Sequence, residues 1–120
     1  MVMESVRILI LGQTKENSYE IRNLLDSRRF ELEIALNKDV GKTVLTTRRM
    51  NLLIIHTEML GSEEIRDFFQ FLDEQGISIP MMLLGEEASR MRQDIPSQGS
   101  LECFDKPYAA EEVLSYIDHI

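Results

Sequence analysis

Cysteine, tryptophan and proline are scarce in this chain, which has one, none and three of them, respectively. A single cysteine excludes an internal disulfide, and Cys103 lies in an apolar stretch, as expected in a reducing cytoplasm. No segment approaches the roughly 20 consecutive apolar residues that a membrane-spanning helix requires. The first five residues, MVMES, lack the basic start and the apolar run of a signal peptide. We therefore expect a cytoplasmic protein with no membrane partner.

The chain also has few basic residues. The 13 lysines and arginines are outnumbered by 21 acidic residues, which gives a formal net charge of -8. Because the negatively charged phosphate backbone of a nucleic acid binds basic surfaces, direct binding of nucleic acid by this acidic chain is not expected. The 43% of hydrophobic residues excludes a disordered chain, and 120 residues suffice for one core without a disulfide or a metal. With no repeat or linker, residues 1–120 are expected to form a single domain.

Five short apolar runs alternate with stretches of helical period. The runs are Val6–Leu11, Phe30–Leu36, Leu52–Ile55, Pro80–Leu84 and Leu101–Phe104. Three of them are continuous in Val, Ile, Leu or Met, which is typical of parallel strands buried on both faces. The run at 30–36 instead alternates, with Glu31 and Glu33 between apolar neighbours, and is expected to be an edge strand.

The stretches between the runs predict helices. Their expected ranges are Ser18–Asp26, Asp39–Arg48, a helix capped by Ser62 and ended by Gly76, a short one within Glu86–Asp94, and Ala109–Asp118. Strict alternation of strands and helices predicts an α/β fold with right-handed crossovers. We expect a doubly wound, five-stranded parallel sheet in the order 2-1-3-4-5, flavodoxin-like, with helices on both faces.

Ligands of such sheets bind beyond the carboxyl ends of the strands, so the residues there bear most on function. A polar loop follows the first strand, Thr57–Gly61 follows the third, Ile79-Pro80 opens the fourth, and Asp105-Lys106-Pro107-Tyr108 follows the fifth. Together these segments resemble the response-regulator receiver (CheY-like) family over essentially the whole chain. The Lys-Pro pair is the most specific of them, and the resemblance implies a cis peptide bond between its two residues.

The resemblance also implies a phosphorylation site, and most of that site is missing here. In the family, two acids after strand one and an aspartate at the end of strand three hold Mg²⁺, and this aspartate accepts the phosphoryl group. The acid pair is replaced by Gly12 and Gln13, the aspartate by His56, the hydroxyl residue after strand four by Gly85, and the aromatic of strand five by Cys103; Lys106 and Pro107 are retained. The resemblance therefore implies a pseudo-receiver with no catalytic residue, metal or cofactor.

Two alternatives involve His56 itself. A phosphohistidine is chemically feasible, but no carboxylates remain in the expected positions to hold magnesium. A metal site combining His56 with Cys103, Glu58 or His119 lacks any ligand pair of recognisable spacing.

A further alternative is a small-molecule sensor, in which an anion or a nucleotide lies above Gly12, Thr14 and Lys106. The segment Val40–Thr43 resembles the end of a phosphate-binding P-loop, but the first glycine of that motif would fall at Leu36. Without that glycine the loop cannot wrap a phosphate.

Without phosphorylation chemistry, what remains is a scaffold with interaction surfaces. We expect a phosphorylation-independent regulatory module, the N-terminal part of a larger bacterial signalling or transcription regulator, which contacts a protein partner or a fused output domain. The same surface allows a homodimer, with Arg90 or Arg92 of one subunit against Glu111 or Glu112 of the other; the alternative is a monomer on which this face is solvated. The residues assigned to this interface are Arg90, Met91, Arg92, Tyr108, Glu111, Glu112 and Tyr116.

Overall fold

The computed structural model describes residues 6–12, 30–57, 62–86, 88–91, 101–105 and 110–118 of the chain. The helix expected at 18–26 lies outside the described residues, as do Gln13, Arg92, Lys106, Pro107 and Tyr108. The expected cis peptide bond after Lys106 therefore stays a prediction. None of the helices in the described segments is long and apolar enough to span a membrane.

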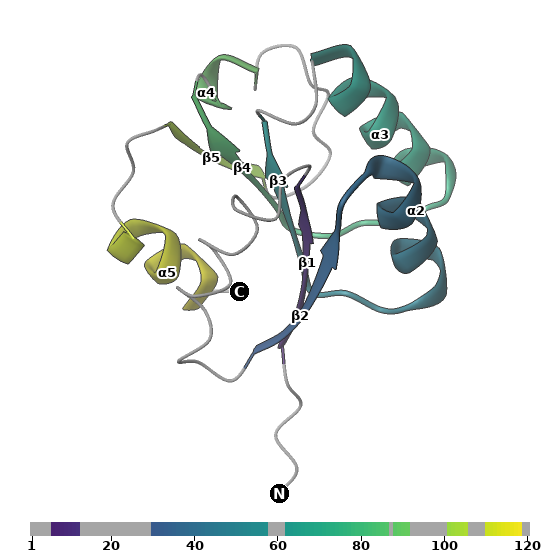
Figure 1. Ribbon diagram of the computed structural model, residues 1–120, viewed down its shortest axis with the longest axis horizontal. Coiled ribbons are helices and arrows are strands. Elements are labelled where there is room, and N and C mark those ends of the chain that lie inside the picture. Colours follow the sequence, from purple (N-terminus) through teal and green to yellow (C-terminus); the bar gives the residue numbers. More distant parts are fainter. Residues whose placement is uncertain are drawn as a thin grey trace, which may run out of the picture.

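A five-stranded parallel sheet forms the centre of the molecule (Figure 1). Its strands are β1 (Val6–Leu11), β2 (Phe30–Ala35), β3 (Leu52–His56), β4 (Met81–Gly85) and β5 (Leu101–Asp105). They lie in the order β2-β1-β3-β4-β5 with parallel pairing throughout, which confirms the expected topology. Every residue of β3 and β4 is buried, whereas β2 lies at the edge and exposes Glu31. Continuous and alternating apolar runs thus occupy central and edge positions, as expected.

Four helices complete the described fold: α2 (Lys38–Thr47), α3 (Ser62–Glu74), α4 (Ala88–Met91) and α5 (Ala110–Asp118). The α2 helix is capped by Asn37, whose side chain accepts a hydrogen bond from the N–H of Val40 at 2.9 Å. The end of α3 is a Schellman turn, in which Gly76 has a φ of +67° and the N–H of Ile77 donates to the carbonyl of Leu72. This turn confirms that Gly76 ends the helix, and α4 is short, as expected.

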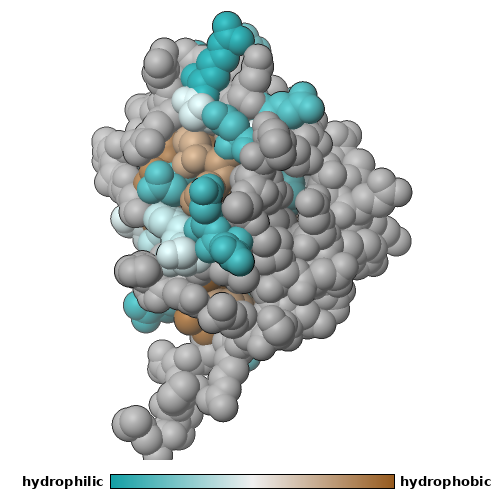
Figure 2. Space-filling view, turned by 90° about the vertical axis from the view of Figure 1, so that its left-hand side faces the viewer, coloured by the Kyte–Doolittle hydropathy of each residue, from teal (hydrophilic) through white to brown (hydrophobic). Residues whose placement is uncertain are grey.

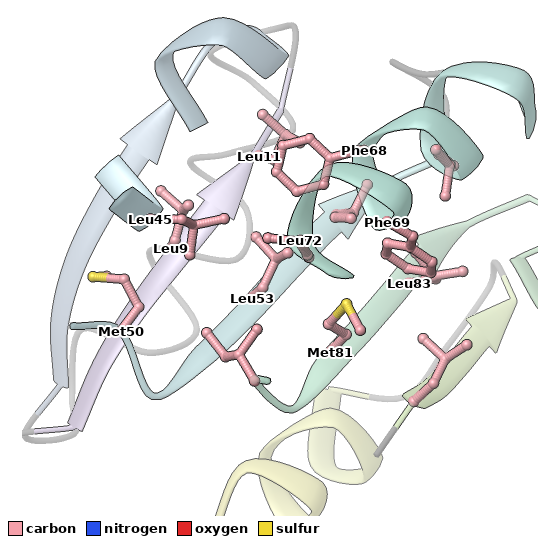
Figure 3. Close-up of a cluster of buried hydrophobic side chains, with 14 of the residues drawn as sticks. Leu9, Leu11, Leu45, Met50, Leu53, Phe68, Phe69, Leu72, Met81 and Leu83 are labelled. Carbon is pink, nitrogen blue, oxygen red and sulfur yellow. The ribbon is translucent and has the colours of Figure 1, made fainter. Parts of the chain in front are cut away.

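Helices cover both faces of the sheet, with a separate apolar cluster on each. On one face α2 and α3 pack over β1, β3 and β4 around the fully buried ring of Phe68 (Figure 3). On the other face α5 contributes Val113 and Ile117 (Figure 1). Each fully buried Leu, Ile or Phe side chain stabilises the fold by about 1.5–3 kcal/mol relative to an exposed one. The two clusters hold the strand ends, and hence the candidate site, in place.

The segment that resembles a P-loop lies inside α2 rather than in a loop. Gly41 is buried there, and a Cβ atom added to it would lie 3.3 Å from Cδ1 of Leu11 and 3.6 Å from Cε2 of Phe68. The glycine thus allows α2 to approach β1 and α3 closely, a packing role that explains its presence. A phosphate-binding loop at 40–43 is excluded, because these residues form regular helix.

Candidate functional site at the carboxyl ends of the strands

The five strands run in parallel, so their carboxyl ends meet at one edge of the sheet. The strands end in Leu11, Ala35, His56, Gly85 and Asp105, and of these residues only the last carries a carboxylate. The residue after β1, Gly12, is buried, and its N–H donates to the carbonyl of Ala35 at 2.9 Å. At this edge, then, Gly12 extends the β1–β2 ladder and offers no ligand atom from a side chain.

His56 forms the last residue of β3 and has no solvent-exposed surface. It pairs with Leu84 of β4, and strand alternation places it on the same face of the sheet as Leu52 and Ile54. A phosphoryl group on this imidazole would bring charge into a buried position, at a large desolvation cost. At the position that corresponds to the phospho-accepting aspartate of the receiver family, the chain thus has a fully buried imidazole.

Thr57 fills the space beside Gly85. Its side chain is almost fully buried, and its N–H donates to the carbonyl of Leu84 at 2.9 Å. Gly85 has a φ of +147°, and a Cβ atom added to it would lie only 2.2 Å from Oγ1 of Thr57. The hydroxyl lies 3.4 Å from the carbonyl oxygen of Leu84. A residue with a side chain at position 85 is thus incompatible with Thr57 as it is placed.

Both carboxylate oxygens of Asp105 are engaged by Ser89 of α4. The backbone N–H of Ser89 donates to Oδ1 at 2.8 Å, and its hydroxyl donates to Oδ2 at 2.5 Å. The Ser89 hydroxyl, followed by its backbone N–H, lowers the pKa of the exposed Asp105 carboxyl below its ordinary value. Asp105 therefore caps the start of α4 from the neighbouring strand.

The residues at these strand ends do not fit a magnesium ion. Mg²⁺ requires oxygen ligands in near-octahedral geometry, usually including carboxylates. Gly12 has no side chain, His56 is a buried imidazole, and Asp105 is bound to Ser89. In the described segments, no group of three or more His, Cys, Asp or Glu residues could hold a metal ion of any kind.

Those residues assigned to an interface that the structure describes lie on α4 and α5. Glu111 and Glu112 are exposed in the first turn of α5, and Arg90 is exposed on α4. Tyr116 is half-buried and meets the ring of Phe104 edge to face, with 6.3 Å between the centroids. The side chain of Met91 and all of Arg92 and Tyr108 lie outside the description.

An open groove of about 530 Å³ runs between β5 and α5. Figure 2 shows this side of the molecule, where apolar surface is bordered by hydrophilic side chains. The groove is lined by Glu102, Phe104, Glu111, Glu112, Ser115 and Tyr116. Glu102 and Phe104 were not among the residues expected at an interface, although their i, i+2 spacing in an apolar run places them on one face of a strand.

Solved structures provide the comparison with known proteins. No protein-family model matches the chain, and no curated protein is similar enough in sequence to match it. A signal receiver domain of an HD-domain-containing protein from Pseudomonas fluorescens Pf-5 has a TM-score of 0.81 at 17% identity, covering 97% of this chain and 94% of that one. A response-regulator receiver domain from Bermanella marisrubri also has a TM-score of 0.81, at 18% identity, covering 97% and 98%.

Full-length FixJ from B. japonicum, a longer protein, matches with a TM-score of 0.79 at 14% identity. The similarity covers 98% of this chain but 58% of that protein. At such identities the similarity defines the fold. The chain has the fold of response-regulator receiver domains, as its sequence resemblance implied.

Proposed function

We propose that this chain is a pseudo-receiver: a regulatory module that binds other proteins without being phosphorylated and that is not itself an enzyme. Its setting would be cytoplasmic bacterial signalling or transcription control. The observation that carries the proposal is the complete burial of His56 at the end of β3, where a receiver would present its phospho-accepting aspartate. A nucleophile without exposed surface cannot meet a phosphodonor in line.

The rest of the strand-end edge supports the same proposal. Phosphoryl transfer depends on positioning and on charge neutralisation by a metal ion and by hydrogen-bond donors. Here Gly12 supplies no carboxylate, and the carboxylate of Asp105 is used to cap α4. The space for a hydroxyl residue at position 85 is filled by Thr57. At positions 12 and 85, residues of the phosphorylation machinery would thus be replaced by residues that serve backbone pairing and packing.

A fused output domain or a separate protein would be the partner of such a module. Full-length FixJ extends well beyond the region that matches this chain, so a receiver fold joined to further sequence has a precedent among its neighbours. The proposed homodimer pairs Arg90 or Arg92 with Glu111 or Glu112 of a second copy. Exposed ion pairs of this kind contribute only about 0–1 kcal/mol each, so apolar contacts would supply most of the affinity.

Thermal unfolding of the chain with added ligands tests the proposal. The additions are magnesium alone, magnesium with beryllium fluoride as a phosphoryl mimic, and nucleotides. A pseudo-receiver predicts an unchanged unfolding temperature in every case, because a ligand stabilises a protein only by binding its folded state. A saturable increase with beryllium fluoride would indicate a working phosphoacceptor, and an increase with a nucleotide would indicate a sensor; either result would overturn the proposal.

A further inference from the structure

Strand β2 lies at the edge of the sheet, with β1 as its neighbour on one side and no described strand on the other. The N–H of Gly12 donates to the carbonyl of Ala35, so the backbone groups of Ala35 point toward β1. Because successive residues of a strand alternate in direction, the N–H and carbonyl groups of Phe30, Leu32 and Ile34 point away from β1. These groups form a row that can pair with another extended segment.

One face of this edge is apolar. The side chains of Phe30, Leu32 and Ile34 lie on the same face of β2, and all three residues are half-buried. Phe30 and Leu32 pack against the α5-side core, which fixes their positions. A strand added beside β2 would place its own apolar side chains next to this row, and such cross-strand pairs stabilise a sheet.

The other face of the edge carries two ion pairs. Nε of Arg7 lies 3.0 Å from a carboxylate oxygen of Glu31, and Arg48, the C-cap residue of α2, pairs with Glu33. Charged side chains on an edge strand ordinarily discourage pairing with another chain. Here each glutamate has its own arginine, so the four side chains together have no net charge and do not repel an uncharged partner.

The two ion pairs also line a hollow of about 230 Å³. Its lining residues are Arg7, Glu31, Leu32, Glu33, Arg48 and Met50. Guanidinium donors and carboxylate acceptors are both present there, on side chains that are 39–58% exposed. A small side chain that both donates and accepts hydrogen bonds, such as that of threonine, fits this lining better than a charged one, which would meet a like charge.

We propose that the open edge of β2 binds an extended segment of a partner protein, which adds to the sheet as an antiparallel strand. Apolar β-branched residues of this segment lie opposite Phe30, Leu32 and Ile34, and its threonines or serines lie opposite Glu31 and Glu33. Antiparallel pairing is the more stable arrangement per residue. The inference rests on the proposed function, since it names a surface of the module and the kind of partner that this surface takes.

A second copy of the chain fits this edge less well. Two-fold pairing centred on Leu32 would set Glu31 directly opposite Glu33 of the second copy, and pairing centred on Glu33 would set that residue opposite itself. Like charges in directly opposite positions destabilise a pair of strands. The homodimer considered above involves residues beside β5, at the opposite edge of the sheet, so it does not compete with an added strand.

Two N-methylated peptides test this inference on the complete 120-residue chain. In both, valine or isoleucine alternates with threonine, and the side chains are identical. One peptide is methylated at the threonines, whose N–H groups would point away from β2, and the other at the valines and isoleucines, whose N–H groups would point toward it. In fluorescence anisotropy, the first should bind saturably and one to one with little dependence on salt, and the second should bind at least about tenfold more weakly.

Variants of Leu32 locate the binding site. Leu32→Pro removes a backbone donor that points away from β1, a change that an edge strand tolerates, and should weaken binding of the first peptide about tenfold or more. Leu32→Ala shortens the same side chain but keeps the donor, so it is the matched control and should bind more tightly than Leu32→Pro. Amide hydrogen exchange of Leu32 and Ile34 should slow in the wild-type complex, and this readout provides the test even if Leu32→Pro fails to fold.

Three results would overturn the inference. Equal affinity of the two peptides would show that side chains, rather than backbone pairing, hold the peptide. Unchanged binding by Leu32→Pro would place the peptide elsewhere, the edge of β5 included. Dimerisation of the wild type that Leu32→Pro abolishes would make a second copy the occupant. None of these results involves magnesium or a phosphoryl mimic, so they are distinguishable from failure of the proposed function.

Discussion

Oγ1 of Thr57 lies where the side chain of residue 85 would begin: a Cβ atom on Gly85 would be 2.2 Å away from it. The two residues are 28 positions apart but adjacent at the carboxyl edge of the sheet. In the receiver family the residue after strand four supplies a hydroxyl to the phosphoryl group. Here the hydroxyl at this place belongs to Thr57, the residue after β3, and lies 3.4 Å from the carbonyl oxygen of Leu84 and 3.5 Å from that of Glu86.

The substitution Gly85→Ala should destabilise the chain by about 1–3 kcal/mol, through the steric overlap with Thr57 and the strained backbone conformation. In a Thr57→Ala background the cost should fall, because Oγ1 is gone and only the backbone strain remains. In a Thr57→Val background it should stay high, because a methyl group occupies the same space. Urea unfolding of all the variants measures the coupling, and costs that are the same in every background would show that the two residues do not interact.

The bond between Asp105 and Ser89 makes a contribution to stability that depends on pH. Because the folded-state pKa of Asp105 is lowered, the contribution is present above the unfolded-state pKa, about 3.9, and is lost as pH falls through the folded-state value. Asp105→Asn should therefore lower the urea midpoint at pH 7, and the difference from wild type should narrow as the pH falls below the unfolded-state pKa and Asp105 becomes protonated. The effect should be modest, since the carboxylate is exposed. A difference that persists unchanged at low pH would exclude the charged cap.

Reversal of the charges on α4 tests the homodimer. Wild type should sediment as a dimer at high concentration, and Arg90→Glu combined with Arg92→Glu should sediment as a monomer, because glutamates would then oppose Glu111 and Glu112. Lys42→Glu, on α2, removes a positive charge that lies over the ring of Phe71 and serves as the control. If wild type is monomeric, or if the reversal leaves the dimer intact, this interface is wrong.

Restoring acids should recover some affinity for magnesium. Gly12→Asp, Gln13→Asp and His56→Asp together recreate the acidic cluster of the receiver family, and calorimetric titration should detect binding that wild type lacks. The same variant should be less stable without magnesium, because three like charges would share a partly buried site. If the hydroxyl residue of the family is also restored by Gly85→Thr, Thr57→Ala should be needed to make space for the new side chain. Magnesium binding by wild type would contradict the loss of the site.

The strands follow from local patterns of apolar residues, with boundary errors of about one residue, and their order follows from the usual order of doubly wound five-stranded sheets. The expected fourth strand began at Pro80, but β4 begins at Met81, since proline has no N–H for the ladder and only its carbonyl pairs, with Leu53. The expected third strand stopped at Ile55, but β3 includes His56, because its pairing with Leu84 continues the ladder. Patterns of apolar residues define interiors of strands better than their ends.

The contacts on which the proposed function rests were harder to predict from the sequence. The sequence shows that His56 and Gly85 replace residues of the receiver family. It does not show that His56 is fully buried or that Thr57 fills the space beside Gly85. The Thr57–Gly85 and Asp105–Ser89 contacts join residues far apart in the chain, and they depend on the φ of one glycine and the position of a four-residue helix. The sequence signals for the first contact were a glycine at the end of one buried strand and a β-branched residue directly after another.

The most direct test of the pseudo-receiver account is the intact mass of the chain after incubation with acetyl phosphate and magnesium at neutral pH. Neutral pH is required because a phosphohistidine would be lost in acid. The restored triple variant provides the positive control and should gain the mass of one phosphoryl group. We predict no mass increase for wild type, because His56 is fully buried. A phosphoryl adduct on wild type that disappears in His56→Ala would contradict the account.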